Sequence, residues 1–287
     1  MPIAALLLLL SAATMHATWN FFAKGARNDA ALSFASASCA SIVYLPIVLV
    51  FIVIERPSFG WQALGFLTVS SVLQVAYFFM LGQGYKRGDL SLVYPLARGT
   101  GPTLAVIGAV ILFGERPSPL AITGTALVVS GIIVMSWSSE LRGGGGIGMA
   151  VAFAMATGGI TATYTLWDKQ GIERLTPLLY GYGIEAGRAL LVAPFVLGRR
   201  GGRERLRATL HDQRRPILAI GLLSPGAYMM VLAALTLAPV SYVAPARELS
   251  ILIGALLGLR LLGESHPVRR MTGATGIVLG IVALALG

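Results

Sequence analysis

LSLVYPLAR, residues 90–98, returns later in the chain as VSYVAPAR, residues 240–247. The two stretches share a serine, a proline and, after a one-residue gap, an arginine. Each opens an apolar block that ends in a glycine–glutamate pair, Gly114–Glu115 after the first and Gly263–Glu264 after the second. The same short pattern at both ends of two apolar blocks predicts a duplicated helical unit.

Two more pairs of segments support the duplication. MHATWNFFAK (15–24) shares its alanine–threonine–aromatic outline with TATYTLWDK (161–169), and AYFFML (76–81) matches AYMMVL (227–232). The matches keep the same order along the chain at an offset near 145–151 residues. A single match of this kind arises by chance, but several in register predict an internal repeat of about half the chain.

The composition is that of a helical membrane protein. Of the 287 residues, 56% are hydrophobic and only 12% are charged, whereas soluble domains carry about 25% charged residues. The apolar residues form blocks of about 20, the length of a bilayer-spanning helix. Alternation of apolar and polar residues is absent, which excludes a membrane β-barrel.

Gly, Pro and charged residues divide the apolar blocks into ten predicted spans. They cover residues 2–24, 31–54, 61–84, 90–113, 119–138, 147–168, 176–198, 216–238, 241–262 and 267–286. The glycine run at 143–146 joins two sets of five, so we expect repeats over residues 1–142 and 143–287. Because five is odd, the second repeat is inverted relative to the first. The predicted fold is an all-α integral membrane protein, two inverted five-helix repeats around a central cavity.

Basic residues predict the orientation. The connections that follow odd-numbered spans hold most of the Lys and Arg, half of the excess coming from GRRGGRERLRATLHDQRR (198–215). The positive-inside rule places these connections in the cytoplasm and both termini in the periplasm, in a bacterial inner membrane. The net charge of +10 is thus explained by topology, and nucleic acid is not expected as a partner. The N-terminal stretch lacks the basic start of a signal peptide, so it is interpreted as a retained first span.

The residues quoted above carry a resemblance to a known family. HATWN with Lys24, YKRGDLSLVYPLARG (85–99), and the LFGE and LLGE endings of the fourth and ninth spans resemble the ten-helix, EamA-type branch of the drug/metabolite transporter superfamily. The resemblance extends over essentially the whole chain. It implies a basket of ten helices, an inverted repeat, a central cavity and alternating access. Bacterial members mostly export amino acids, other metabolites or toxic cations, and one branch exports aromatic amino acids.

The function expected is therefore a secondary transporter that exports small metabolites, with amino acids, aromatic ones included, as the first candidates. A nucleotide-sugar exchanger or an importer of the same fold is the alternative. A membrane-embedded enzyme is disfavoured, because HExxH, GxSxG and GxxxxGK[ST] motifs are absent. Gradients must supply the energy, and both proton antiport through Glu185, Glu248 or His16 and facilitated diffusion remain open.

Ionisable residues at membrane depth are the first site candidates, because burying them is costly. They are Arg98, Arg247, Glu248, Glu185, Arg188 and His16. Three arginines against two glutamates leave one excess positive charge, which predicts a solute that carries a carboxylate. Arg98 follows Pro95, which loosens the helix, and Arg247 is its counterpart in the second repeat.

Each of these candidates also has a structural interpretation. Glu185 and Arg188 are three positions apart on one helix face and can neutralise each other. Glu248 can pair with Arg98 or Arg247 in the same way, and His16 can simply bond to a neighbour. Lys24, Asp168 and Lys169 lie at predicted helix ends, where they suit interfacial anchors or gate pairs better than ligands.

Aromatic residues on the repeated segments are the second set of candidates. They are Trp19, Tyr77, Tyr94, Tyr164, Trp167 and Tyr228. Tyrosine and tryptophan suit the wall of a cavity that accepts flat or amphipathic solutes. An interfacial aromatic belt is the alternative for those near span ends, such as Trp167. His16, Trp19 and Asn20 share one face of the first span and are expected to point inward.

Cofactors and metals are not expected. Cys39 is the only cysteine, which excludes a disulfide framework and a cysteine metal site. The expected partners are a small-molecule substrate with a carboxylate and the surrounding lipids, with the chain acting as a monomer or a homodimer.

Overall fold

Helices make up all of the regular structure in the described part of the chain. The computed structural model describes residues 1–23, 26, 29–87, 90–136, 147–253 and 267–287. Its elements are α1 (Ile3–Ala23), α2 (Ala30–Glu55), α3 (Trp61–Arg87), α4 (Leu90–Phe113), α5 (Pro119–Ser136), α6 (Ile147–Gly171), α7 (Pro177–Leu197), α8 (Gly202–Asp212), α9 (Arg214–Leu237), α10 (Val240–Ala246) and α12 (Pro267–Leu286). The predicted all-α membrane fold is confirmed.

The outer surface is apolar, as a bilayer requires. Six of the described helices are long and apolar enough to cross a membrane, and α5 and α12 contain the shorter apolar stretches Pro119–Val134 and Met271–Leu286. Large aliphatic side chains on the outside, such as Ile42, Val53 and Ile111, are exposed. Lipid tails are the medium in which such exposure costs nothing.

The predicted spans agree with the helices to within a few residues, except for span 241–262. There α10 ends at Ala246, a turn follows at Arg247 and Glu248, and helix resumes at residues 249–253. The amide of Glu248 bonds to the carbonyl oxygen of Pro245, three residues back, at 3.1 Å. Pro245 lacks an N–H and leaves one carbonyl of the preceding turn without its usual donor. The predicted continuous span is therefore wrong, and the break places two charged residues at a turn.

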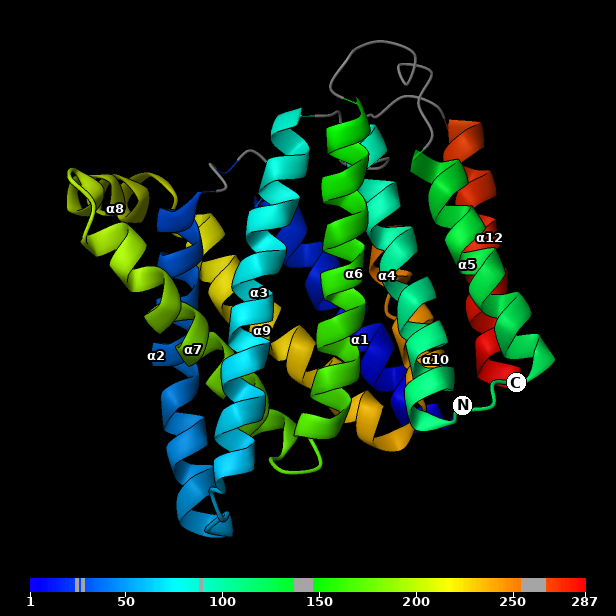
Figure 1. The fold of residues 1–287 in the computed structure, drawn as a ribbon, viewed down its shortest axis with the longest axis horizontal. Helices are drawn as coiled ribbons and strands as arrows, with labels where there is room; N and C mark the ends of the chain where they lie inside the picture. Colours follow the sequence, from blue (N-terminus) through cyan, green and yellow to red (C-terminus); the bar gives the residue numbers. More distant parts are fainter. Residues whose placement is uncertain (24–25, 27–28, 88–89, 137–146, 254–266) are drawn as a thin grey trace.

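A short amphipathic helix, α8, replaces what the sequence suggested was a basic connection. It lies against the ends of α2, α7 and α9 (Figure 1). Leu206 packs against Ala31, Val192 and Val196, whereas the arginines of α8 are exposed. Only about one residue in each turn of α8 is apolar and faces the bundle. A search for long apolar blocks therefore does not detect this helix.

The two halves run in opposite directions. Figure 1 shows successive membrane helices alternating: α1 rises from the end of the molecule where both termini lie, and α6 descends toward that end. The amino group of Met1 donates to the carbonyl oxygen of Ala285 at 2.9 Å, which joins the two termini. Because α1 opens the first half and α6 the second, the repeats are inverted. The expected boundary between residues 142 and 143 lies outside the described residues.

Helix contacts follow the same symmetry. The helix α1 packs on α9, while its counterpart α6 packs on α3, so first and third spans exchange partners between halves. The pairs α2 with α7, α4 with α10, and α5 with α12 each join matching members of the two halves. This arrangement relates the halves by an approximate two-fold axis in the membrane plane.

Candidate functional site

The buried charges converge where the break after α10 meets α4. Nη1 of Arg98 lies 3.0 Å from Oε2 of Glu248, with 25% of the arginine side chain exposed and 1% of the glutamate. Nε of Arg247 lies 3.7 Å from Oε1 of the same carboxylate. Arg98 and Arg247 occupy matching positions in the two repeats, and Glu248 of the second repeat joins the halves through Arg98.

Three tyrosines adjoin this ion pair. The guanidinium carbon of Arg247 lies 5.8 Å from the centre of the Tyr164 ring, within the range of a cation–π interaction. Tyr164 packs edge-to-face against Tyr77, at 6.3 Å between ring centres, and against Tyr228, at 6.1 Å. The rings come from α3, α6 and α9, so the charges lie beside an aromatic cluster as the sequence suggested.

Asp168 is the site residue that sequence reasoning missed. Its side chain is fully buried. Oδ1 accepts hydrogen bonds from Oγ of Ser70 at 2.6 Å and from the Tyr180 hydroxyl at 2.9 Å, and Oδ2 accepts one from the Tyr228 hydroxyl. The expectation of an interfacial anchor is wrong, because α6 continues to Gly171 and carries Asp168 inside the bundle.

Asp168 changes the charge balance of the interior. The sequence count of Arg98, Arg188 and Arg247 against Glu185 and Glu248 left one positive charge in excess. Adding the buried Asp168 gives three arginines and three acids, so these groups sum to zero. Within this set of six groups, the ionised Asp168 offsets the one positive charge in excess that the sequence count gave.

Glu185 and Arg188 form an ion pair of their own on α7. Nη2 of Arg188 lies 2.5 Å from Oε2 of Glu185, and both side chains are buried. The guanidinium lies over the ring of Phe78, 5.0 Å from its centre. The structural interpretation of this pair agrees with the geometry, and the pair borders the cluster because Phe78 packs against Tyr77.

The polar stripe of α1 is held together within the helix. Nε1 of Trp19 donates to Nδ1 of His16 at 3.0 Å, and Nδ2 of Asn20 donates to the His16 carbonyl oxygen at 2.6 Å. His16 and Trp19 are half-buried, whereas Asn20 is exposed. Tyr94 lies in α4, but its side chain is outside the described part of the structure.

Trp167 is half-buried near the end of α6 and contacts α3. Its Nε1 donates to the carbonyl oxygen of Phe66 at 3.0 Å, and the two rings pack 4.7 Å apart. Lys169 also turns inward, because its Nζ donates to the carbonyl oxygen of Leu235 at 2.6 Å. Lys24 lies outside the described residues.

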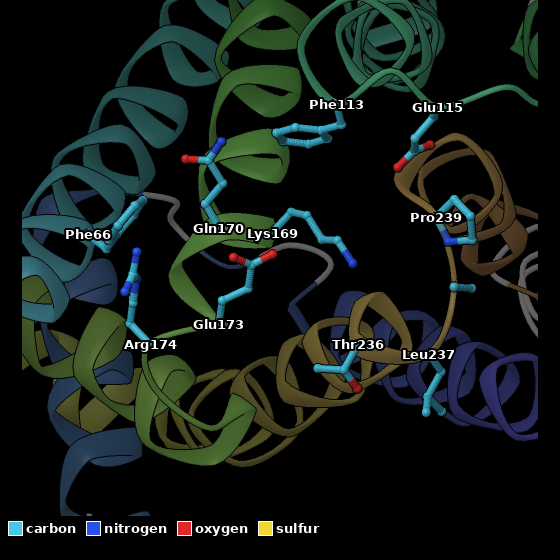
Figure 2. Close-up of a pocket in the computed structure, with 11 residues that line it drawn as sticks. Phe66, Phe113, Glu115, Lys169, Gln170, Glu173, Arg174, Thr236, Leu237 and Pro239 are labelled. Carbon is cyan, nitrogen blue, oxygen red and sulfur yellow. The ribbon is translucent and has the colours of Figure 1, made fainter. Parts of the chain in front are cut away.

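A cavity of about 570 Å³ opens beside the cluster, at the end of the molecule where the termini lie. Figure 2 shows Phe113, Glu115 and Pro239 on one part of its rim and Phe66, Glu173 and Arg174 on another, with Lys169 between them. Phe66 belongs both to this wall and to the hydrogen-bond network around Asp168. The arginines, Glu248 and the three tyrosines of the cluster are not among the residues that line the cavity.

Glu115 fixes the start of α10 at the edge of the cavity. Its two carboxylate oxygens accept hydrogen bonds from the backbone amides of Val240 and Ser241 at 2.8 and 2.9 Å. These are among the first amides of a helix, which have no partner within it. Glu115 thereby caps α10, and its counterpart Glu264 lies outside the described residues.

The comparison with known families decides the class of protein. The profile of the EamA-like transporter family matches residues 3–137 and, a second time, residues 148–286. The chain belongs to this family. The EamA-like transporters are membrane transporters of the drug/metabolite type and are generally not enzymes.

One solved structure extends the comparison to the whole fold. A structure titled "Crystal structure of protein" has a TM-score of 0.79 to this EamA-like chain at 15% sequence identity, and the alignment covers 98% of each chain. At this identity the likeness concerns the fold. Comparison with curated proteins finds no significant match.

In this EamA-like transporter, the structure brings six of the thirteen residues expected at the site into one set of contacts. Arg98, Arg247, Glu248, Tyr77, Tyr164 and Tyr228 form one continuous set of contacts. Ser70, Asp168 and Tyr180 were missed. For Asp168 a signal existed: it lies four positions after Tyr164 and therefore shares its helix face.

Proposed function

We propose that this EamA-like transporter exports small amphipathic metabolites, with amino acids, including aromatic ones, as the leading class. Transport proceeds by alternating access across the bacterial inner membrane. A single observation carries the proposal: Arg98, partly exposed, is held by Glu248 of the other repeat, and this pair is connected through Arg247 to a cluster of three tyrosines. This arrangement offers one anchor for a carboxylate and one surface for an apolar side chain.

The carboxylate anchor follows from the chemistry of arginine. The guanidinium of Arg98 now binds Oε2 of Glu248, and a solute carboxylate presents the same acceptor in a geometry that a planar guanidinium binds through two hydrogen bonds. When the solute carboxylate replaces that of Glu248 at Arg98, a contact between the two repeats is broken. Solute binding would thereby act on the interface that must rearrange during transport.

The charge balance favours a zwitterion over a simple anion. With Asp168 ionised, the three arginines and three acids sum to zero, so a net anion entering that state would bring an unbalanced charge into the interior. An amino acid brings one charge of each sign. The edge-to-face rings of Tyr77, Tyr164 and Tyr228 suit a flat or amphipathic side chain, because aromatic pairs prefer such contacts.

The direction of transport is supported by the distribution of arginines. The side on which the cavity opens carries the few basic connections, whereas the opposite side carries the exposed arginines of α8 and its neighbours. Under the positive-inside rule the cavity faces the periplasm. The sequence contains no nucleotide-binding loop, so a gradient drives the cycle.

Uptake into proteoliposomes tests this function. The purified protein is supplied with labelled amino acids and, separately, with sugar nucleotides. Saturable counterflow of amino acids alone is expected. Arg98→Gln should lower their transport by at least about tenfold, because it removes the charged carboxylate donor. Arg116→Gln, the same change at an exposed loop position, should leave the rate unchanged.

Two outcomes would overturn the proposal. Counterflow of sugar nucleotides but not of amino acids would assign the transporter to the exchanger alternative. Equal amino acid transport by the Arg98→Gln and Arg116→Gln variants would remove the carboxylate anchor.

A further inference from the structure

Asp168 differs from the other buried acids in what holds it. Glu185 has the guanidinium of Arg188 at 2.5 Å, and Glu248 has that of Arg98 at 3.0 Å. Among the described residues, the Asp168 carboxylate accepts hydrogen bonds from hydroxyl groups only. The neighbouring Lys169 is directed away, to the Leu235 carbonyl. Within the part of the chain that the structure describes, Asp168 thus has no basic side chain at ion-pair distance, unlike Glu185 and Glu248.

This difference determines which acid can gain a positive charge at low cost. Placing a proton or a cation on Glu185 or Glu248 would leave a buried arginine without its counter-charge, which costs several kcal/mol. The same step at Asp168 strands no arginine, and it removes an isolated negative charge from the interior. The hydroxyl partners adapt, because a hydroxyl group both donates and accepts.

The position of Asp168 connects the cavity with the aromatic cluster. Tyr228 donates to Oδ2 and packs against Tyr164, which lies under Arg247. On the other side, Tyr180 donates to Oδ1 and shares its hydrogen with the carbonyl of Phe66, at 3.3 Å, in the cavity wall. A solute whose carboxylate binds at the arginines would extend its other polar group toward Asp168.

Three helices supply hydroxyl donors to the carboxylate, while α4, which also packs on α6, contributes the Arg98 that is paired with Glu248. Ser70 of α3, Tyr180 of α7 and Tyr228 of α9 donate to it directly. Beyond Tyr228 and Tyr164, the nearest charges in this chain of contacts are Arg247 and its partner Glu248, while α7 contributes the self-paired Glu185 and Arg188. The surroundings are polar and aromatic, which suits an ammonium group as well as a proton.

We propose that Asp168 is the site where the amino group of the solute and a proton compete. The inference rests on the proposed function and adds the amine-recognition site and the coupling step to it. In the empty transporter, Oδ2 takes a proton from cavity water, and the Tyr228 hydroxyl turns from donor to acceptor. When the ammonium group enters, that proton returns to water and the ammonium donates to the carboxylate in its place. One proton leaves for each solute bound, which makes the carrier an antiporter.

Three probes of one shape test the site: L-phenylalanine, 2-phenylethylamine and 3-phenylpropionate. They carry both charged groups, the amine alone and the carboxylate alone. Asp168→Asn should raise the half-saturation concentrations of the two amines by about thirtyfold, as expected for losing one partner of a buried charge pair, and leave phenylpropionate within twofold. Asp212→Asn, the same change at an exposed position of α8, is the matched control.

A second measurement follows the proton. Addition of 2-phenylethylamine to weakly buffered, purified wild type should release protons, and the Asp212→Asn variant should behave alike. Asp168→Asn should release none, and Asp168→Glu, which keeps a carboxylate, should restore the release. The Asp168→Glu variant also keeps the test meaningful if the asparagine variant fails to fold.

The outcomes separate this inference from the proposed function. Equal discrimination among the probes by Asp168→Asn and wild type would overturn the role of Asp168 while leaving the transporter intact. If wild type transports none of the probes, the amino acid proposal falls. Infrared spectroscopy would then decide whether Asp168 binds a proton. The band of a protonated carboxyl group should appear on acidification of the wild type. The same band in the Asp168→Asn variant would refute protonation of Asp168.

Discussion

The Tyr180 hydroxyl is one of three donors to the buried Asp168 carboxylate, and its loss should be measurable. Tyr180→Phe removes a hydrogen bond to a charged acceptor, which costs about 2 kcal/mol and lowers the apparent Tm by about 5 °C. Thermal unfolding in detergent, followed by circular dichroism, measures the shift.

Tyr182→Phe provides the control on the same helix. Tyr182 is half-buried, and its hydroxyl makes no hydrogen bond with a described residue. The same chemical change there should leave the Tm within about 1 °C of wild type. A Tyr180→Phe variant as stable as Tyr182→Phe would mean that the two remaining donors satisfy the carboxylate.

For individual residues, the sequence predicted the pairing of Glu248 with Arg98 but missed the partners of Asp168. The spacing of His16 and Trp19 predicted that they share one helix face, which their hydrogen bond requires, and the repeat matched Arg98 with Arg247. The partners of Asp168 could not be inferred, because Ser70 and Tyr228 are far from it in the chain and share no motif with it. Their proximity is a product of three-dimensional packing.

Helix pairs depend on glycine where two backbones touch, and α5 with α12 is the clearest case. A Cβ atom on Gly131 would lie 2.6 Å from the carbonyl oxygen of Gly273, and one on Gly124 would lie 2.7 Å from that of Gly280. Backbone carbonyls cannot rotate away as flexible side chains do. The GIVLG stretch, residues 276–280, is therefore the packing surface that its small-residue spacing suggests.

Gly131→Ala should consequently force α5 and α12 apart. We expect a destabilisation of about 2 kcal/mol, the usual cost of overpacking a tight contact, seen as a lower apparent Tm. Gly65→Ala in α3 is the control, since a Cβ atom there meets nothing within 4 Å and alanine favours a helix. Equal Tm values for the two variants would contradict the close backbone contact.

Apolar length predicted the membrane helices well because the bilayer sets it. The two errors at this scale have local causes. α8 is short, and most of its residues are polar, so it resembles a loop when hydropathy alone is considered. The break after α10 occurs at Pro245 and the two charged residues that follow it, where the helical hydrogen bonding is interrupted. The segment as a whole is still apolar on average, so hydropathy does not reveal the break.

The inverted architecture was predictable because the two halves still share short sequence matches at their functional ends. Four segments in register sufficed to pair the spans, and the contacts of α1 with α9 and of α3 with α6 follow that pairing. The position of the cavity was not predictable. It depends on which side of the bundle is packed more tightly in this conformation. Because the two repeats are similar in sequence, their comparison does not show which side is open.

The orientation of the whole molecule yields the last prediction. Glu173 is exposed at the cavity rim, and Arg203 is exposed on α8 at the opposite end (Figure 1). In a Cys39→Ser background, Glu173→Cys should react with a membrane-impermeant maleimide in intact cells. Arg203→Cys should react only after permeabilisation, because translocating the arginine-rich segment 198–215 is unfavourable.

The labelling pattern bears directly on transport. If Arg203→Cys reacts in intact cells and Glu173→Cys does not, the cavity faces the cytoplasm and the charge distribution misled the assignment. The protein described here would then be in an inward-facing conformation with a periplasmic α8. Reaction of Glu173→Cys in intact cells, with Arg203→Cys reacting only after permeabilisation, supports a structure open to the periplasm. In that state an exporter releases its solute and can bind the proton for the return step.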